Sequence, residues 1–226
     1  MNVYSSEKVS EKDHRIGVIH TTDEEYLQLT GTYEDAKEIM LSRLNILNHN
    51  LYVKPLGQPV HNIQDRIKKK ESLEEKLTRK GKETTLENAK HYIQDIAGIR
   101  VICYFVDDIY NLVNTLKKQS DLVVIRESDY IKAAKPNGYR SYHIIVGVPL
   151  YYTDGMEYFP VEIQLRTMAM DLWASMEHRI LYKHERSGRE MLAVELKEYA
   201  ENLLAIEEKF EQYSVGKMNA EHFHKV

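Results

Sequence analysis

The chain has 226 residues, 42% of them hydrophobic, which suits one globular domain with helical extensions better than two full domains. Its net charge of −4 disfavours a protein that binds DNA over its whole surface, so any anion site has to be local. No apolar run approaches the roughly 18 residues of a membrane span, and the polar N-terminal region lacks the apolar core of a signal peptide, which predicts a cytoplasmic protein without a membrane partner.

The N-terminal part is predicted to be a flexible arm followed by a helical region. Residues 1–21 are polar and aperiodic, whereas Thr22 and Glu25 have the spacing of a capping box. We expect the helical region to cover residues 22–54, with Gly31 as a candidate interruption. Its apolar positions recur at intervals of three and four residues, the stripe of an amphipathic helix: Tyr33, Ala36, Met40, Leu44, Leu47 and Leu51.

A basic segment comes next. Residues 63–67 alternate as in a short strand, and residues 72–77 have a helical pattern. Between Arg66 and Lys82 there are eight Lys and Arg side chains against three Glu. Such a run is either a solvated face or the local anion site that the net charge requires.

Residues 99–106 are apolar on both alternating faces after Arg100, which predicts a central strand covered on both sides. Arg100 is expected at the edge of this strand. Cys103, the single cysteine, is expected to be a buried structural thiol. Asp107 is the predicted cap of a helix over residues 109–118.

Three more strands are predicted over residues 122–126, 142–148 and 158–166, and the last two are joined by the hairpin signal Tyr152-Thr-Asp-Gly155. Strands and helices alternate along the chain. The pattern therefore predicts an α/β fold with a mixed, partly antiparallel sheet of about five strands, flanked by helices.

Two helices are predicted to close the ordered part of the chain, over residues 167–182 and 189–213, with a loop at Ser187 and Gly188 between them. The last helix has an apolar stripe that packs either against the same chain or against a neighbouring one. Its members are Leu192, Leu196, Tyr199, Leu203, Ile206 and Phe210.

The segment from Lys135 to His143 combines the chemistry that a nucleotide needs. Its first part favours a turn, its cations suit phosphates, and its rings suit a base or a hydrogen bond. The alternative for the segment alone is an ordinary loop. Its residues are Lys135, Pro136, Asn137, Gly138, Tyr139, Arg140, Ser141, Tyr142 and His143.

Carboxylates occur at two suggestive places. Strand alternation puts Glu162, Gln164 and Arg166 on one face of the last strand, where a solvent-exposed face is the simpler interpretation. Asp95 stands at the mouth of the central strand, where ligands of α/β sheets bind, although it also suits a helix cap. On neighbouring strands the two carboxylates could share a Mg²⁺ ion together with phosphate oxygens, an arrangement that serves phosphoryl transfer.

Several other chemistries are disfavoured. The sequence has neither a Gly-x-x-x-x-Gly-Lys-Ser/Thr loop nor a Gly-x-Gly-x-x-Gly fingerprint. One cysteine cannot build a cysteine-pair zinc site, and we expect His222 and His224 to belong to a tail over residues 215–226.

Five motifs in this order resemble the synthetase domain of the RelA/SpoT superfamily, and the short chain is most similar to its single-domain small alarmone synthetases of the RelP/RelQ type. The motifs lie between Arg66 and about His178. They are Arg66-x-Lys68 with Ser72 and Lys76, then Asp95-Ile-Ala-Gly-Ile-Arg100, Gly138-Tyr-Arg-Ser-Tyr-His143, Glu162-Ile-Gln-Leu-Arg166 and Trp173-Ala-Ser-Met-Glu-His178.

The resemblance implies a nucleotidyltransferase-like synthetase fold and a GTP diphosphokinase activity that uses Mg²⁺. Its substrates would be ATP and GTP or GDP. The β,γ-diphosphate of ATP would move to the ribose 3′-hydroxyl of the guanine nucleotide, giving pppGpp or ppGpp plus AMP for a bacterial stress response.

The resemblance also implies a role for each matched residue. Arg66 and Arg100 would stack on either side of adenine, Tyr139 would stack on guanine, and Glu162 would activate the 3′-hydroxyl. The residues implied for ATP are Arg66, Lys68, Ser72, Lys76 and Arg100; those for GTP or GDP are Lys135, Tyr139, Arg140, His143, Gln164 and Arg166; those for catalysis and Mg²⁺ are Asp95 and Glu162. Trp173, Glu177 and His178 are expected to brace the site, with no exact role assigned.

The longer family members carry a hydrolase domain ahead of the synthetase portion. Too few residues precede Arg66 for that domain, and no His-Asp dipeptide occurs, so synthesis without alarmone hydrolysis is expected. Residues 55–183 would form the catalytic core. Residues 184–214 would form a C-terminal helix that assembles a homotetramer, as in small synthetases of this family.

Two other interpretations stay open. One is a catalytically silent module that binds RNA or assembles through the basic segment 66–82, which both retained carboxylates disfavour. The other is a nucleotidyltransferase with another acceptor, which the surroundings of Tyr139 disfavour. The sequence does not rank GTP, GDP and GMP as acceptors, and it does not identify an allosteric alarmone site.

Overall fold

The computed structural model describes residues 22–52, 57–183 and 189–214. The predicted arm 1–21, the loop at Ser187 and Gly188, and the tail 215–226 lie outside these residues. The elements are α1 (Asp23–Asn50), β1 (Val60–Ile67), α2 (Lys70–Arg79), α3 (Leu86–Tyr92), β2 (Ala97–Cys103), α4 (Val106–Lys117), β3 (Val123–Asp129), β4 (Tyr142–Tyr152), β5 (Gly155–Thr167), α5 (Met168–Lys183) and α6 (Arg189–Ser214).

The predicted mixed sheet is confirmed, with five strands in the order β1-β2-β5-β4-β3. Within it, β2 and β5 run parallel, while β1–β2, β4–β5 and β3–β4 are antiparallel. The predicted hairpin is also present, since Tyr152 pairs with Gly155. The parallel pair β2–β5 forms the middle of the sheet.

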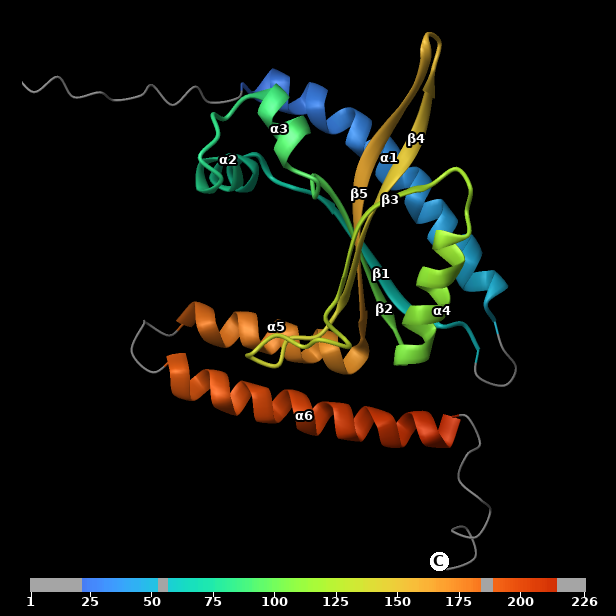
Figure 1. Cartoon of the computed structure of the whole chain (residues 1–226), viewed down its shortest axis with the longest axis vertical. Helices are drawn as coiled ribbons and strands as arrows, with labels where there is room; N and C mark the ends of the chain where they lie inside the picture. The colour runs from blue at the N-terminus through green and yellow to red at the C-terminus, as the bar shows by residue number, and fades with distance from the viewer. Residues whose placement is uncertain (1–21, 53–56, 184–188, 215–226) are drawn as a thin grey trace, which may run out of the picture.

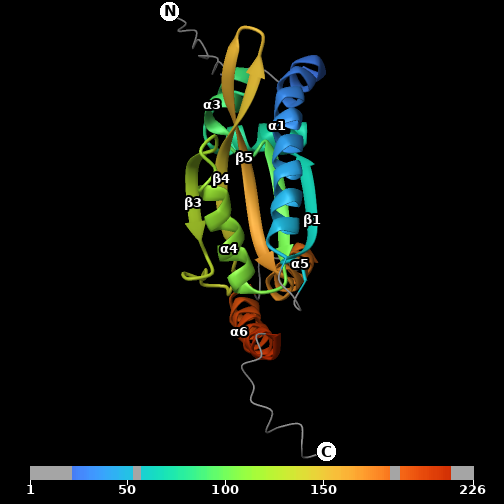
Figure 2. The same cartoon turned by 90° about the vertical axis from the view of Figure 1, so that its right-hand side faces the viewer.

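One face of the sheet is covered by α1 and α4 (Figures 1 and 2). The capping box at the start of α1 is confirmed: Thr22 Oγ1 accepts from the Glu25 N–H at 3.2 Å, and Glu25 Oε2 accepts from the Thr22 N–H at 2.7 Å. The predicted stripe from Tyr33 to Leu47 is buried against the sheet. Each such large apolar side chain contributes roughly 1.5–3 kcal/mol of burial.

The expected interruption at Gly31 is wrong, because α1 continues through it. A helical glycine costs about 1 kcal/mol relative to alanine. Leu29, Thr30 and Tyr33 are all buried on the packed side of the helix, and this tertiary contact outweighs that local penalty.

The boundary after the central strand also differs from the prediction. Strand β2 ends at Cys103, and Val106 already belongs to α4. The carboxylate that closes the helix start is Asp108, not Asp107: its Oδ2 accepts from the Phe105 N–H at 3.0 Å. Cys103 is buried as expected, and burial raises the pKa of its thiol far above the usual range.

The other face of the sheet is flanked by α2 and α3 at one end and by α5 and α6 at the other (Figure 1). Helix α3 was not predicted. It has only seven residues, and Thr85 caps it by accepting from the Asn88 N–H at 3.2 Å. None of the described helices is long and apolar enough to cross a membrane.

Helix α6 packs on α5 through a small apolar cluster. Trp173 of α5 donates its indole N–H to the Leu196 carbonyl at 2.6 Å, and Ala200 lies in the same cluster. The apolar stripe predicted for this helix is therefore split. Leu196 is buried in the chain, while Tyr199, Ile206 and Phe210 stay exposed.

Candidate functional site

A row of polar side chains crosses the sheet face opposite α1. The register places Arg66 beside Gly98, Gly98 beside Glu162, and Arg100 beside Gln164. On the other side of β5, Gln164 pairs with His143 of β4. Because side chains alternate along a strand, four strands present their functional groups to one face.

A cavity of about 190 Å³ lies over β1 and β2 and includes Arg66, Arg100 and Glu162 in its lining. Arg100 is in the middle of its strand, not at the strand edge as predicted. Its side chain is 34% exposed, and burial together with the charge of Arg166 lowers the pKa of Arg100. Two arginines that line one cavity suit a flat base that carries phosphates.

A second cavity, of about 140 Å³, lies over β4 and the end of α2. Lys76, Asp95 and His143 line it, and so does Glu162. Glu162 is thus the carboxylate that the two cavities share. A group at this junction can reach a ligand in either cavity.

Asp95 is held between two lysines. Its Oδ2 lies 2.7 Å from Lys76 Nζ and 3.0 Å from Lys68 Nζ. Burial alone would raise the pKa of Asp95, but the hydrogen bonds and charges of these lysines outweigh it and lower the pKa. The carboxylate is therefore ionised at neutral pH.

The other oxygen of Asp95 suits a metal. Oδ1 is buried and makes no hydrogen bond to any residue that the structure describes. Asp95 and Glu162 line the same cavity, and a hard cation such as Mg²⁺ takes one or two carboxylates with phosphate oxygens. These two residues fit a Mg²⁺ site.

A second cluster of acidic side chains does not suit a metal ion in this way. Oxygens of Glu34, Glu38 and Asp65 lie within 4.8 Å of one another. However, the ammonium of Lys37 lies 2.5 Å from Asp65 and also pairs with Glu34 and Glu38. The protein already supplies the cation there.

The predicted turn before β4 is present. Gly138 has φ +90°, and its N–H donates to the Lys135 carbonyl at 2.9 Å. A Cβ at Gly138 would meet Cβ of Ala200 at 2.8 Å, so the loop is seated directly on α6. Lys135 Nζ lies 4.7 Å from the ring centre of Tyr130 and 4.6 Å from that of Tyr139.

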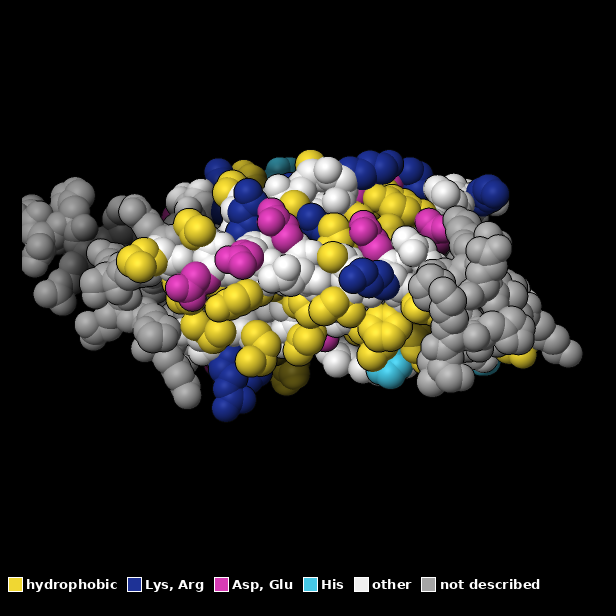
Figure 3. Space-filling view, turned by 90° about the horizontal axis from the view of Figure 1, so that it is seen from below, with side chains coloured by type: hydrophobic (Ala, Val, Ile, Leu, Met, Phe, Trp, Pro, Cys, Tyr) yellow, Lys and Arg dark blue, Asp and Glu magenta, His cyan; other side chains and the backbone are white. Residues whose placement is uncertain are grey.

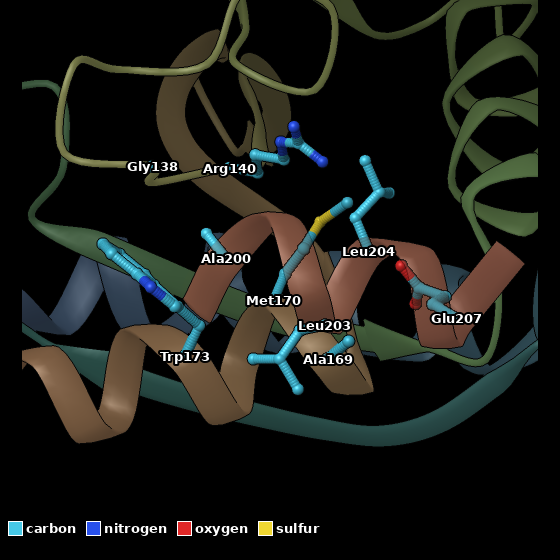
Figure 4. Close-up of a pocket in the computed structure, with 9 residues that line it drawn as sticks. All are labelled: Gly138, Arg140, Ala169, Met170, Trp173, Ala200, Leu203, Leu204 and Glu207. Atoms are coloured by element: carbon cyan, nitrogen blue, oxygen red, sulfur yellow. The ribbon is translucent and has the colours of Figure 1, made fainter. Parts of the chain in front are cut away.

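Three predicted residues are placed differently from the rest. Arg140 lines a small pocket with Glu207 between the loop, α5 and α6 (Figure 4). Arg166 is buried, and its guanidinium donates to Asp171 at 3.0 Å. Ser72 lies exposed on the first turn of α2. Their assignments to bound nucleotides stay predictions.

The bracing expected from α5 is present in two contacts. Glu177 Oε1 accepts from Asn137 Nδ2 at 3.2 Å, which ties the helix to the loop. The ring centres of Trp173 and Tyr139 are 6.3 Å apart. Both contacts orient the segment that carries Tyr139.

Three residues of the site could not be predicted from the sequence. Asp171 of α5 pairs with Arg166 and has an oxygen 3.8 Å from Arg100 Nη1. Tyr130 and Arg126 line the second cavity. None of them belongs to a motif. The one available signal was that Asp171 follows Arg166 by five residues, in the first turn of the helix after β5.

Together, the mixed sheet, the cationic cavities and the paired carboxylates are those of an α/β protein that binds nucleotides through their polyphosphates. The family model described as "Region found in RelA / SpoT proteins" matches residues 65–187. GTP pyrophosphokinase YwaC of Bacillus subtilis is 41% identical over 191 residues, which are 84% of this chain and 91% of YwaC. The chain therefore belongs to the RelA/SpoT family, as its motifs predicted.

Solved structures agree with this placement. Small alarmone synthetase 2 of B. subtilis superposes with a TM-score of 0.72 at 39% identity, covering 84% of this chain and 98% of that one. Small alarmone synthetase 1 of B. subtilis, bound to its product pppGpp, gives a TM-score of 0.75 at 32% identity, covering 87% and 100%. Its AMPCPP-bound structure gives 0.69 at 29%, also covering 87% and 100%.

Proposed function

We propose that this chain is a GTP pyrophosphokinase that transfers the β,γ-diphosphate of ATP to the ribose 3′-hydroxyl of GTP or GDP. The observation that carries the proposal is the place of Glu162, where a cavity with two arginines meets a cavity with Asp95 and Lys76. The pyrophosphokinase name of the 41% identical relative and the product bound to a second relative support the same reaction.

The base of the donor nucleotide occupies the first cavity in this proposal, and its phosphates extend past Glu162 into the second cavity, which Lys76 lines. Arg66 and Arg100 stack on adenine, and each cation–π contact contributes roughly 0.5–2 kcal/mol. Lys68, Lys76 and Ser72 bind the phosphates. The distances of both lysines to Asp95 support this proposal, because two ammonium groups converge beside the carboxylate that is proposed to hold the metal.

The acceptor nucleotide lies beside the first cavity in this proposal, toward Tyr139, which Gln164 of that cavity contacts at 2.8 Å. Tyr139 stacks on guanine, Gln164 orients the ribose, and Lys135 contacts phosphate. Lys135 Nζ lies 4.6 Å from the Tyr139 ring centre, so guanine would stack on that face only when the ammonium moves aside toward the phosphates. Arg140, His143 and Arg166 complete the acceptor set inferred from the family motifs.

In the reaction, the 3′-oxygen attacks the β-phosphorus of ATP and the bond between the α,β-bridging oxygen and that phosphorus breaks. AMP leaves with the bonding electrons. Glu162 accepts the hydroxyl proton, and its partial burial beside the sheet limits competition from water. A Mg²⁺ ion held by Asp95 and Glu162 would neutralise charge on the phosphates.

Isotope transfer tests this proposal. The protein is incubated with Mg²⁺, GTP and ATP labelled in the α-, β- or γ-phosphate, and the products are separated. Label from the β and γ positions should reach the guanine nucleotide, while α-label stays in AMP. Incorporation of α-label without AMP release would instead establish nucleotidyl transfer and refute the proposal.

Two substitutions test the residue assignments. Glu162→Gln should abolish turnover while leaving the oligomeric state unchanged, and near-normal activity would remove its role as the base. Tyr139→Ala should mainly raise the KM for the guanine nucleotide by about 10-fold, since stacking on a base contributes roughly 1–3 kcal/mol. An unchanged KM would contradict the stacking role.

We further propose that copies of the chain assemble into a homotetramer through α6 in the cytoplasm. Tyr199, Ile206 and Phe210 are each at least half exposed on α6, and Figure 3 shows apolar side chains spread along this face. Apolar surface of this kind is typical of association surfaces. Light scattering of the protein and of Phe210→Glu measures the assembly, and a monomeric wild type would contradict it.

A further inference from the structure

The floor of the site contains one connected hydrogen-bond network whose directions can be deduced from donors and acceptors alone. It runs from the donor cavity, through the phenol of the tyrosine proposed to stack on guanine, to His143 beside the proposed base. Its members are Arg100, Gln164, Tyr139, Arg166 and His143. Beyond the network, His143 Nδ1 faces Glu162 Oε1 at an ion-pair distance of 3.4 Å.

The orientation of the Gln164 amide is determined by Arg100. Arg100 Nε lies 3.2 Å from Gln164 Oε1, and a guanidinium has only donors, so the amide oxygen has to face it. The amide nitrogen then faces the other way. It lies 2.8 Å from Tyr139 Oη and 3.1 Å from His143 Nε2, and it can only donate to them.

The hydroxyl of Tyr139 is constrained in the same way. It receives hydrogen bonds from Gln164 Nε2 at 2.8 Å and from Arg166 Nη2 at 3.1 Å. Arg166 is itself held by Asp171 at 3.0 Å. With both lone pairs of the phenol occupied, its own hydrogen points to the third partner, His143 Nε2, at 3.0 Å.

We propose that His143 carries its ring hydrogen on Nδ1 and uses it to position the carboxylate of Glu162. Two donors, from Tyr139 and Gln164, point at Nε2, so a hydrogen on Nε2 would oppose both. Nδ1 lies 3.4 Å from Glu162 Oε1. With the hydrogen on Nε2, a lone pair on Nδ1 would face a carboxylate and repel it.

In this scheme both ring nitrogens of His143 face protein groups, so His143 is a positioning residue and not the phosphate ligand that the family motifs imply. Its catalytic consequence rests on the proposed function. Nδ1–H faces Oε1 of Glu162 at 3.4 Å, which leaves Oε2 for the acceptor hydroxyl and for the Mg²⁺ ion proposed above. The phenol of Tyr139 gains a second task besides stacking, because its hydroxyl sets the histidine tautomer. The network thereby couples the residue under guanine to the residue that removes the proton.

The tautomer can be measured without nucleotide. Long-range ¹H–¹⁵N spectra of the ¹⁵N-labelled protein distinguish Nδ1–H from Nε2–H, and His143 is assigned by the loss of its signals in His143→Asn. The wild type should show Nδ1–H. Gln164→Glu replaces the donor that faces Nε2 with an acceptor, so Nε2 should then carry a hydrogen.

Gln119→Glu is the matched control, because Gln119 pairs with Arg43 elsewhere in the chain. It makes the same chemical change and should leave the His143 signals unmoved. A hydrogen on Nε2 in the wild type would overturn the proposal, and so would an unchanged tautomer in Gln164→Glu.

Kinetics test the positioning role with a pair of variants. His143→Asn retains an N–H near the δ position, whereas His143→Gln places its amide near the ε position. We expect kcat of the Asn variant to exceed that of the Gln variant by about tenfold, the value of one hydrogen bond to a charged group, with similar KM values. Equal kcat values would refute the role.

The two proposals fail in different ways. If no diphosphate is transferred, the proposed function and the catalytic role of His143 are both wrong, whatever the tautomer. If diphosphate is transferred but the wild-type ring carries its hydrogen on Nε2, only the present inference is wrong.

Discussion

Glu207 provides the sharpest test of how α6 is held on the chain. Its side chain enters the pocket beside Arg140, and the residue is only 7% exposed (Figure 4). Burial raises the pKa of Glu207 to about 7, although a hydrogen bond from Thr167 and the charge of Arg140 oppose the rise. We predict that Glu207→Gln stabilises the protein above neutral pH.

The sign and size of the stabilisation by Glu207→Gln follow from the linkage between proton binding and folding. A carboxyl whose pKa is raised in the folded state favours folding fully below its unfolded pKa of 4.5 and loses that contribution as the pH rises to about 7. At 1.36 kcal/mol per pKa unit, the loss is at most about 3 kcal/mol. Glutamine keeps the shape and stays neutral, so its gain should approach this value at pH 8 and nearly vanish at pH 4.5.

The assay is urea unfolding of both proteins at several pH values and at equal protein concentration. A gain of 2–3 kcal/mol at pH 8 would also raise Tm by about 4–12 °C in a chain of this size. Glu208→Gln is the control, because Glu208 is the exposed neighbour on the same helix. No gain at pH 8, or an equal gain at pH 4.5, would refute the reasoning.

Four further substitutions probe the loop, helix α1 and the two cavities. Gly138→Ala should destabilise the protein by about 1–3 kcal/mol in thermal unfolding, because Gly138 has a φ of +90° and an added Cβ would lie 2.8 Å from Ala200. Gly31→Ala should stabilise the protein by about 1 kcal/mol, because an added Cβ there would meet nothing within 4 Å. The opposite ranking of the two variants would contradict the structure. Asp95→Asn should lower kcat by at least about 100-fold in the label-transfer assay, since it removes the carboxylate proposed to hold the metal, and activity within a few-fold of wild type would exclude that role. Arg100→Ala should raise the KM for ATP by about 2- to 30-fold, and an unchanged KM would mean that this side chain does not contact the donor base.

Features that depend on neighbouring residues in the sequence could be predicted well. The capping box of Thr22 and Glu25 is local, and so is the alternation that brings Glu162 and Gln164 to one face. The family motifs implied ATP phosphates for Lys68 and Lys76 and a metal for Asp95, but their ion pairs with one another were not predicted, because these residues come from separate elements.

The remaining features depend on tertiary contacts that carry no local signal. Arg140 lies among the phosphate candidates in the sequence, yet α6 creates the pocket that it lines, some 60 residues further along the chain. Asp171 has no motif, and only the packing of α5 brings it to Arg166. Likewise, Gly31 remains helical because α1 is pressed against the sheet.

The single tryptophan of the chain has a consequence for experiments. Trp173 is buried, donates to the Leu196 carbonyl of α6, and lies against the ring of Tyr139. Its emission therefore comes from one known place, between the segment 135–143 and the last helix. The native protein carries a built-in optical reporter, so stopped-flow fluorescence would time the arrival of a guanine nucleotide at the proposed acceptor site without any attached dye.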